Sequence, residues 1–275
     1  MKLAYVTFAD NRYKPTRDRA KKEVQALGIF DRIYAFSEDD FDLPFKDVFY
    51  GEHRDKMFAF GYYSWAPWAC KHALDQIEDN DILFYSDAGN TINPNGKKRL
   101  LEWIEMVSHD DNDILGIVHE QYKEYEYTKE DVFHYFGIDK NDIIRKTGQF
   151  FVGALVIRKT KSSSDLINQW FEAGSMRLEL IDETALLQND PRFVAYRYDQ
   201  SLISVLLKKY DKVVTVDYSE VCLSGRSTKG LENAPFWAFR TKEITLWAKI
   251  EMLPKRIVNR ICRLFGLKVV YRYKV

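Results

Sequence analysis

Short apolar runs alternate with amphipathic segments along the first 220 or so residues. The runs predict buried strands, at 3–8, 32–37, 81–85, 114–118, 150–157 and 213–216. Segments with helical periodicity lie between them, at 16–27, 67–77, 97–107, 128–137, the stretch ending at Trp170, and 200–210. Strands that alternate with helices indicate an α/β sandwich with a mostly parallel central sheet and flanking helices.

Local signals refine the helix ends. Gly28 is a plausible stop for the first helix, and Pro67 marks the start of another. Thr128 and Asp131 have the spacing of a capping box. Asp199 precedes the run SLISVLLKKY, so we expect it to be the N-cap of that helix.

Composition narrows the class of protein. The chain has 275 residues, 46% of them hydrophobic, and 41 basic residues balance 41 acidic ones. This balance argues against a nucleic-acid partner. Three widely spaced cysteines, Cys70, Cys222 and Cys262, form neither a disulfide framework nor a zinc site, which favours a reducing cytoplasm. We find no signal peptide and no stretch long enough to cross a bilayer.

Several enzyme classes lack their motifs. The turn after the first strand is Ala9-Asp10-Asn11-Arg12, so the glycine pattern of a dinucleotide oxidoreductase is missing. There is no Walker motif and no Gly-x-Ser-x-Gly elbow. A nucleotidyltransferase is disfavoured because no glycine-rich basic loop follows the first strand.

The segment Tyr85-Ser86-Asp87-Ala88-Gly89 is the strongest functional candidate. It ends an apolar strand with a carboxylate, and ligands of open α/β sheets bind at the carboxyl ends of strands. Such a carboxylate can hold a divalent cation that neutralises a diphosphate. Small Ala88 and Gly89 allow a ligand to approach the backbone. The alternative is an acidic turn residue that caps the following segment.

A longer pattern includes this segment. The aromatic run Gly61-Tyr62-Tyr63-Ser64-Trp65-Ala66-Pro67-Trp68, a helix, and the strand ending in Asp-Ala-Gly follow one another. Together they resemble bacterial glycosyltransferases of the GT-A fold that act on capsular and surface polysaccharides. Tyr63 stands where that family usually has Trp, and Ala66 where it has Lys. Gly89 replaces the second carboxylate of the Asp-x-Asp motif of the wider fold.

The resemblance covers most of residues 1–240 and implies a role for each matching residue. The donor would contact Thr7, Asp10, Asn11, Arg12, Arg17, Tyr63, Trp65, Ser86, Asp87, Ala88 and Gly89, with Arg226, Lys229 and Arg240 near its diphosphate. Asp87 would bind Mn²⁺ or Mg²⁺. The acceptor would contact Tyr122, Tyr125, Tyr127, Gly153 and Gln200.

Two carboxylates are candidates for the catalytic base. Asp199 is the first and Glu120, after the strand at 114–118, is the second. Asp199 could instead serve only as a helix cap, and Glu120 could be an exposed loop acid. The tyrosines could pack as a lid, and the loop at 224–230 could be solvated surface. Inversion and retention of configuration both remain open.

The implied function is transfer of a hexose from a nucleotide-diphosphate donor, in the first instance a UDP-sugar, to a glycan or lipid-linked acceptor in surface polysaccharide synthesis. The alternative is a catalytically silent module that binds sugar nucleotides or glycans on the same fold. Gly89 and Ala66 favour that alternative.

The C-terminal segment differs in composition. We divide the chain into a catalytic domain at 1–240 and a basic amphipathic tail at 241–275. From Leu246 onward, a single acid, Glu251, accompanies many bases, namely Lys249, Lys255, Arg256, Arg260, Arg263, Lys268, Arg272 and Lys274. A helix with an apolar stripe and basic flanks can lie on an anionic membrane. We therefore expect a cytoplasmic protein that is peripheral on the inner face of the membrane, unless the tail packs on the domain.

Overall fold

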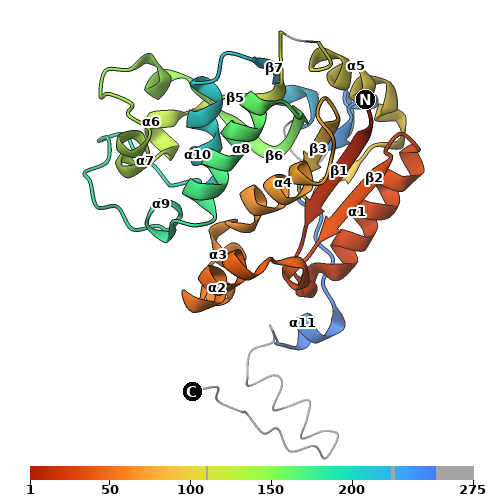
Figure 1. Ribbon diagram of the computed structural model, residues 1–275, viewed down its shortest axis with the longest axis horizontal. Helices are drawn as coiled ribbons and strands as arrows, with labels where there is room; N and C mark the ends of the chain where they lie inside the picture. The colour runs from red at the N-terminus through yellow and green to blue at the C-terminus, as the bar shows by residue number, and fades with distance from the viewer. Residues whose placement is uncertain (110, 224–226, 252–275) are drawn as a thin grey trace, which may run out of the picture.

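The protein is built around one mixed β-sheet, seen in a computed structural model that describes residues 1–109, 111–223 and 227–251 (Figure 1). The strands are β1 (Leu3–Phe8), β2 (Arg32–Phe36), β3 (Ile82–Ser86), β5 (Ile114–Lys123), β6 (Gly148–Arg158) and β7 (Val213–Asp217). Their order is β2-β1-β3-β6-β5-β7, and every strand except β6 runs in one direction. The predicted α/β sandwich with a mostly parallel sheet is therefore confirmed.

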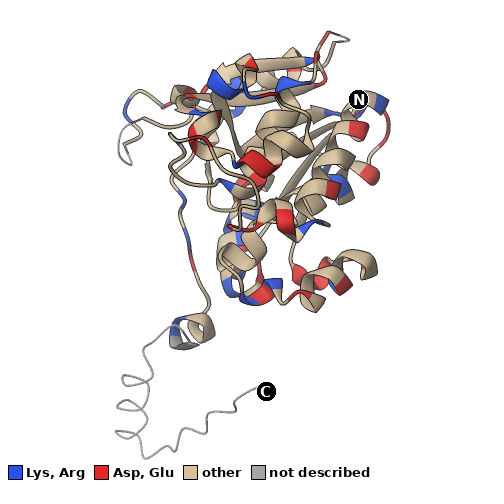
Figure 2. Cartoon of the chain, turned by 90° about the vertical axis from the view of Figure 1, so that its left-hand side faces the viewer, with Lys and Arg blue, Asp and Glu red and all other residues tan. Residues whose placement is uncertain are grey.

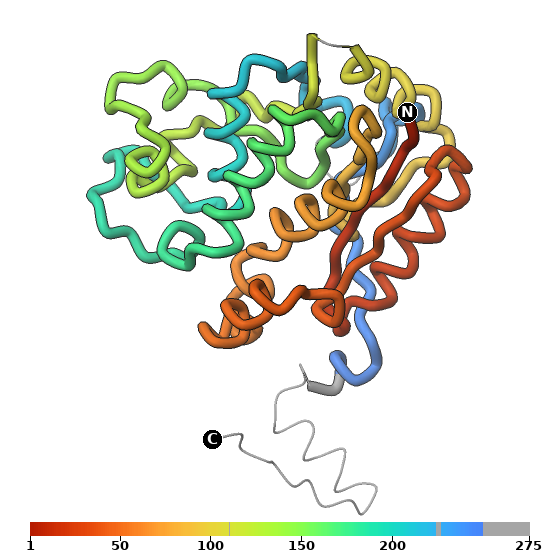
Figure 3. The backbone as a smooth tube through the Cα atoms, in the orientation of Figure 1, coloured from red at the N-terminus to blue at the C-terminus, as the bar shows by residue number. Residues whose placement is uncertain are grey.

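Helices cover both faces of the sheet (Figure 3). On one face α4 (Trp65–Asp75), α8 (Lys161–Gly174) and α10 (Tyr198–Lys208) share a core with strand residues such as Leu83 and Leu155. On the other face α1 (Lys14–Leu27) and α5 (Lys97–Met106) pack on residues such as Tyr5 and Phe84. Because both faces are covered, the strands read as continuous apolar runs.

Shorter elements complete the fold. A two-stranded sheet pairs β4 (Thr91–Ile92) with β8 (Phe236–Trp237). The short helices are α2 (Leu43–Gly51), α3 (Ala59–Tyr62), α6 (Glu124–Tyr127), α7 (Glu130–Tyr135), α9 (Leu178–Ile181) and α11 (Leu246–Glu251). Acidic and basic residues are interspersed over the elements, in keeping with the balanced charge (Figure 2).

Three local predictions are wrong. Helix α4 begins at Trp65, because a proline is tolerated in the first turn of a helix. Helix α10 begins at Tyr198, so Asp199 lies in its first turn and Arg197 is the N-cap residue. The capping box at Thr128 does not form, because its hydroxyl donates to the Glu124 carboxylate instead.

The chain continues against the domain after residue 240. The Thr241 amide donates to the Gly89 carbonyl at 2.7 Å, and the Thr16 hydroxyl donates to the Glu243 carbonyl at 2.7 Å. Leu246 and Trp247 follow, with 72% and 76% of their surfaces exposed. The remainder of the predicted tail, 252–275, lies outside the described residues. Within the described part of the chain, no helix is both long enough and apolar enough to span a membrane.

Candidate active site

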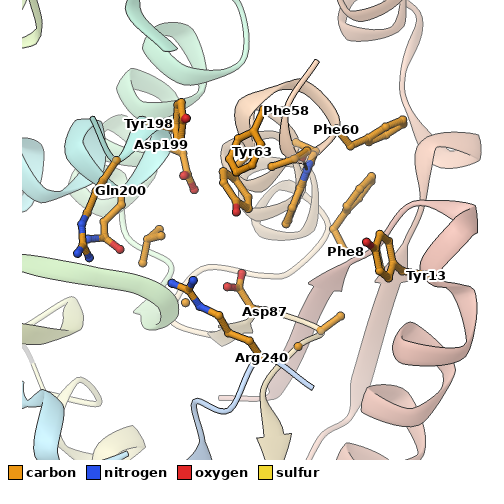
Figure 4. Close-up of a pocket in the computed structure, with 18 of the residues that line it drawn as sticks. Phe8, Tyr13, Phe58, Phe60, Tyr63, Asp87, Tyr198, Asp199, Gln200 and Arg240 are labelled. Atoms are coloured by element: carbon orange, nitrogen blue, oxygen red, sulfur yellow. Dashed lines mark hydrogen bonds between the residues drawn. The ribbon is translucent and has the colours of Figure 1, made fainter. Parts of the chain in front are cut away.

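A pocket of about 590 Å³ opens at the carboxyl ends of β1 and β3 (Figure 4). One wall comes from the turn after β1 and from the segment 57–65, and the opposite wall comes from 195–200 at the start of α10. The floor is formed by 87–90 after β3 and by 151–153 in β6, and Arg240 and Lys242 reach in from the C-terminal segment. The site therefore joins segments that are far apart in the sequence.

Asp87 is held rigidly at the floor of the pocket. Its backbone amide donates to the Gly153 carbonyl at 3.0 Å, and the Tyr85 hydroxyl donates to its carboxylate at 2.7 Å. Burial raises the pKa of Asp87, whereas the Tyr85 hydrogen bond and the positive charges of Arg240 and Lys242 oppose that rise. The carboxylate thus has a fixed orientation and two cations nearby.

Asp199 provides a second carboxylate, which points into the pocket from α10 (Figure 4). The residue is only 4% exposed, and the Trp170 indole donates to its backbone carbonyl at 3.2 Å. No side chain among the described residues donates a hydrogen bond to the Asp199 carboxylate. Burial, and after it the charge of Asp87, raises the pKa of Asp199 well above its usual range. A buried carboxylate of raised pKa in a cleft is a typical candidate for proton transfer.

Three arginines line the pocket, and two of them are engaged by protein groups. Arg12 makes hydrogen bonds of 2.9 and 3.0 Å with Asp10 and lies 5.2 Å from the centre of the Phe60 ring. The Arg197 guanidinium lies over the rings of Tyr122 and Tyr127, at 3.9 and 4.4 Å from their centres. Among the described residues, none forms a hydrogen bond or ion pair with the guanidinium of the third, Arg240, which is exposed. It is therefore free to bind an anionic ligand.

One wall of the pocket is a left-handed turn. Ala59, Phe60, Gly61, Tyr62 and Tyr63 all have positive φ, between 50° and 83°. Each such residue other than glycine costs about 1–2 kcal/mol, so the surrounding packing must impose the turn. The buried Phe60 ring stacks near Phe8 and Phe49, and a side chain at Gly61 would lie 2.7 Å from the Phe49 ring. Strain of this kind is concentrated at functional sites in proteins.

The turn presents aromatic rings to the opposite wall. Tyr62 stacks on Tyr198 with 5.2 Å between ring centres, and Phe58 lies 5.6 Å from the same ring. Tyr198 also has positive φ, and its hydroxyl donates to Glu183 at 2.5 Å. Burial, and then the charges of Asp199 and Asp87, raises the pKa of Tyr63 to about 12. Its hydroxyl therefore stays protonated and can donate a hydrogen bond to a ligand.

Many of the residues chosen from the sequence meet in this pocket. Those that line it are Asp10, Arg12, Tyr63, Trp65, Asp87, Ala88, Gly89, Tyr127, Gly153, Asp199, Gln200 and Arg240. Sequence reasoning missed Arg197, Tyr198 and Lys242, which also line it. Arg197 and Tyr198 directly precede Asp199-Gln200 in the sequence, and this position could have identified them as candidates.

Other chosen residues lie outside the pocket, namely Thr7, Asn11, Arg17, Ser86, Glu120, Tyr122, Tyr125 and Lys229. Arg17 donates to the backbone carbonyls of Ala9 and Phe36, which ties the first helix to β1 and β2. Glu120 is exposed beside Lys123. Arg226 falls outside the described residues.

The two glycines in the pocket differ in how closely protein groups surround them. A side chain on Gly153 would lie 2.2 Å from the Phe151 ring, so the absence of one makes room for that ring. A side chain on Gly89 would meet the Cα of Arg240 at 3.4 Å, which is an ordinary van der Waals contact. Gly89 thus lies next to the C-terminal segment.

The described side chains around Asp87 do not provide enough ligands to hold a metal ion by themselves. The described residues contain no group of three or more His, Cys, Asp or Glu side chains that could hold a metal ion. Asp87 provides one carboxylate, one oxygen of which already accepts from the Tyr85 hydroxyl, and the neighbouring charges that act on it are the cations Arg240 and Lys242. We therefore derive no chemical step through a metal.

Comparison with known proteins adds structures of similar arrangement. No protein-family profile and no curated protein matches the sequence. A glycosyltransferase involved in the glycosylation of the major capsid of PBCV-1 shares 9% identity over 86% of this chain and 94% of its own, with a TM-score of 0.46. Mouse xyloside xylosyltransferase 1, in its apo form, shares 9% over 88% and 94%, with a TM-score of 0.43. The galactosyltransferase LgtC, in complex with donor and acceptor sugar analogs, shares 13% over 99% and 98%, with a TM-score of 0.37. At such low identities and TM-scores we draw no functional conclusion from these likenesses.

Proposed function

We propose that the protein is a glycosyltransferase of the GT-A type that transfers a hexose from a nucleotide-diphosphate donor, in the first instance a UDP-sugar. The acceptor is a glycan or a lipid-linked glycan in surface polysaccharide synthesis. One observation carries the proposal: the half-buried carboxylate of Asp87 and the buried carboxylate of Asp199 enter one pocket together with the unpaired guanidinium of Arg240. Such a pocket offers a proton acceptor beside a binding site for an anionic leaving group.

The charges of the pocket suggest how the donor lies. The diphosphate is placed beside Arg240 and Lys242, the two cations that reach the floor near Asp87. The nucleoside then extends over the end of β1, where Tyr13 offers aromatic surface and Asp10 offers polar atoms. The sugar is left facing Asp199 and Gln200.

The proposed chemistry uses Asp199 as the general base of an inverting transfer. The acceptor hydroxyl gives its proton to the Asp199 carboxylate while its oxygen bonds to the anomeric carbon. The bond from that carbon to the diphosphate breaks, and the leaving oxygen takes the electron pair. Arg240 and Lys242 stabilise the charge that develops there. In a retaining reaction Asp199 or Gln200 would instead lie near the reacting face of the sugar.

A silent binding module remains the second candidate. The observation that favours it is the incomplete set of metal ligands around Asp87, in which Gly89 replaces a carboxylate. Such a module would bind a sugar nucleotide but release no free or transferred sugar.

We also propose that the protein is cytoplasmic and peripheral on the inner membrane face. Leu246 and Trp247 are exposed large apolar side chains where the basic tail begins, which supports insertion into a lipid interface. The proposed partners are therefore the donor, the acceptor and an anionic lipid surface.

The test is a panel of nucleotide sugars, each measured by thermal shift and by release of its nucleoside diphosphate. Each is assayed with and without Mn²⁺ or Mg²⁺, because the diphosphate itself can supply oxygen ligands to a cation beside Asp87. The proposal expects a stabilising donor that also turns over. Stabilisation without turnover, in the presence of acceptor glycans, would support the binding module. No stabilisation by any member would contradict both candidates.

A further inference from the structure

A chain of buried polar side chains leads from the surface to the pocket. It starts at the ion pair of Lys208 with Glu124, whose carboxylate also accepts hydrogen bonds from the hydroxyls of Thr128 and Ser204. The next member is Gln149, which is completely buried in β6. The last is Gln200, which lines the pocket.

Hydrogen-bond chemistry fixes which way the Gln149 amide points. Its Nε2 lies 3.1 Å from a carboxylate oxygen of Glu124 and 3.0 Å from the Thr128 hydroxyl oxygen. The carboxylate accepts only, and the Thr128 proton is already given to Glu124. This edge of the amide must therefore be the NH₂ group, so the carbonyl oxygen of Gln149 occupies the other edge.

That orientation fixes Gln200 in turn. The Oε1 of Gln149 can only accept, and the group that it meets at 2.9 Å is the Nε2 of Gln200. The Gln200 amide is thereby held with its NH₂ group on Gln149, and its Oε1 is left for the pocket. No donor among the described residues bonds to this oxygen. Figure 4 shows the side chain next to Asp199, at the edge of the pocket.

We propose that Gln149 is a positioning residue that holds Gln200 as a hydrogen-bond acceptor for one hydroxyl of the bound sugar. This rests on the proposed function, since it deepens the description of the same pocket. A fixed carbonyl oxygen selects a ligand group that donates, so a saccharide with a hydroxyl at this position is bound in preference to its deoxy analogue. The Lys208–Glu124 ion pair makes Glu124 a hydrogen-bond acceptor at the start of this series of side chains. It thereby determines the direction of the hydrogen bonds that follow, through Gln149 to Gln200.

Gln149 is the member to perturb, because all the hydrogen bonds of its side chain go to other side chains. Ser204 is less suitable, because its hydroxyl also accepts from the Phe150 backbone amide at 2.8 Å. Gln149→Met keeps the length of the side chain and removes both amide atoms. Gln169→Met, on the exposed side of α8, is the matched control.

The first readout is the exchange of the Gln side-chain amide protons, followed by NMR in the free full-length protein. In the wild type the amide protons of Gln200 should be protected, and Gln149→Met should abolish that protection while Gln169→Met leaves it unchanged. Unchanged protection of Gln200 in Gln149→Met would overturn the proposal. If Gln149→Met does not fold, Gln149→Asn, which retains an amide but is too short to reach both neighbours, takes its place.

The second readout is a double-mutant cycle on transfer, using UDP-glucose, UDP-galactose and UDP-N-acetylglucosamine as probes. Gln149→Met should lower kcat/KM about tenfold, the value of one oriented hydrogen bond, and should lower it no further in a Gln200→Met background. An equal loss in both backgrounds would show that Gln149 acts by general stability and would overturn the proposal. If the wild type neither binds nor turns over any probe, the proposed function fails, and the amide exchange alone decides the role of Gln149.

Discussion

Asp199→Asn should remove transfer while making the protein no less stable. The substitution keeps the size of a side chain that is 4% exposed, and it removes a charge that the buried site disfavours. Loss of a general base typically costs about 10²–10⁴-fold in rate. Because Arg197 is the N-cap residue of α10, no helix cap is lost.

The contribution of Asp199 to the free energy of unfolding should change with pH in one direction. The pKa of Asp199 is raised in the folded protein, above all by burial, so the folded state binds the proton more tightly than the unfolded state. Below the unfolded pKa of about 3.9 the Asp199 carboxyl is protonated in both states, so burying it does not lower the free energy of unfolding through its charge. As pH rises from there to the raised folded pKa, stability is lost, at about 1.4 kcal/mol for each unit by which the two pKa values differ. Asp199→Asn removes that loss.

The assay is thermal unfolding of wild type and Asp199→Asn between pH 4 and pH 8 or so, with transfer measured on the same samples. The variant should become more stable relative to wild type as pH rises, and its transfer should be at background. Parallel pH profiles would refute the burial of an ionisable Asp199. Transfer at the wild-type rate would refute its role as base.

Four further predictions concern the donor, its cations and the tail. Asp87→Asn should abolish transfer with the fold intact by circular dichroism, and a variant with wild-type turnover would remove Asp87 from the site. UDP or a UDP-sugar at about a hundredfold excess over Kd should stabilise the protein by about 2.7 kcal/mol; no thermal shift with any nucleotide sugar would argue against donor binding. Arg240→Gln should weaken UDP binding about tenfold, as expected for a lost charge-assisted hydrogen bond, whereas Arg192→Gln, which is exposed and paired with Asp190 outside the pocket, should not. The full chain should co-sediment with anionic liposomes in a salt-sensitive way and a chain ending at 251 should do so less; equal sedimentation would place membrane binding elsewhere.

The sheet could be predicted from the sequence because its strands are covered on both faces. A run such as Ile82–Ser86 is buried at every position, so its apolar pattern has no competing explanation. Asp87 could also be found, since ligand groups gather where parallel strands end. The start of α4 does not follow from Pro67, because proline is compatible with several positions in the first turn of a helix.

Other parts of the site depend on contacts that no local pattern contains. The left-handed turn at 59–63 places L-residues in a conformation that their own preferences oppose, and only packing against residues such as Phe49 imposes it. Thr128 is a different case, because its hydroxyl donates to a local partner four residues earlier, the buried Glu124, and not to the backbone of the expected helix. Lys242 reaches the pocket from a segment that composition alone assigned to a tail.

The most direct test of the account is transfer of a radiolabelled sugar from its nucleotide donor by the full-length protein, with Asp199→Asn and Asp87→Asn measured in parallel. The account predicts labelled product with the wild type and at least about a hundredfold less with Asp199→Asn, although both variants remain folded. Nucleotide-sugar binding by all three proteins without labelled product from any of them, across a panel of acceptor glycans, would contradict the claim that this pocket is catalytic.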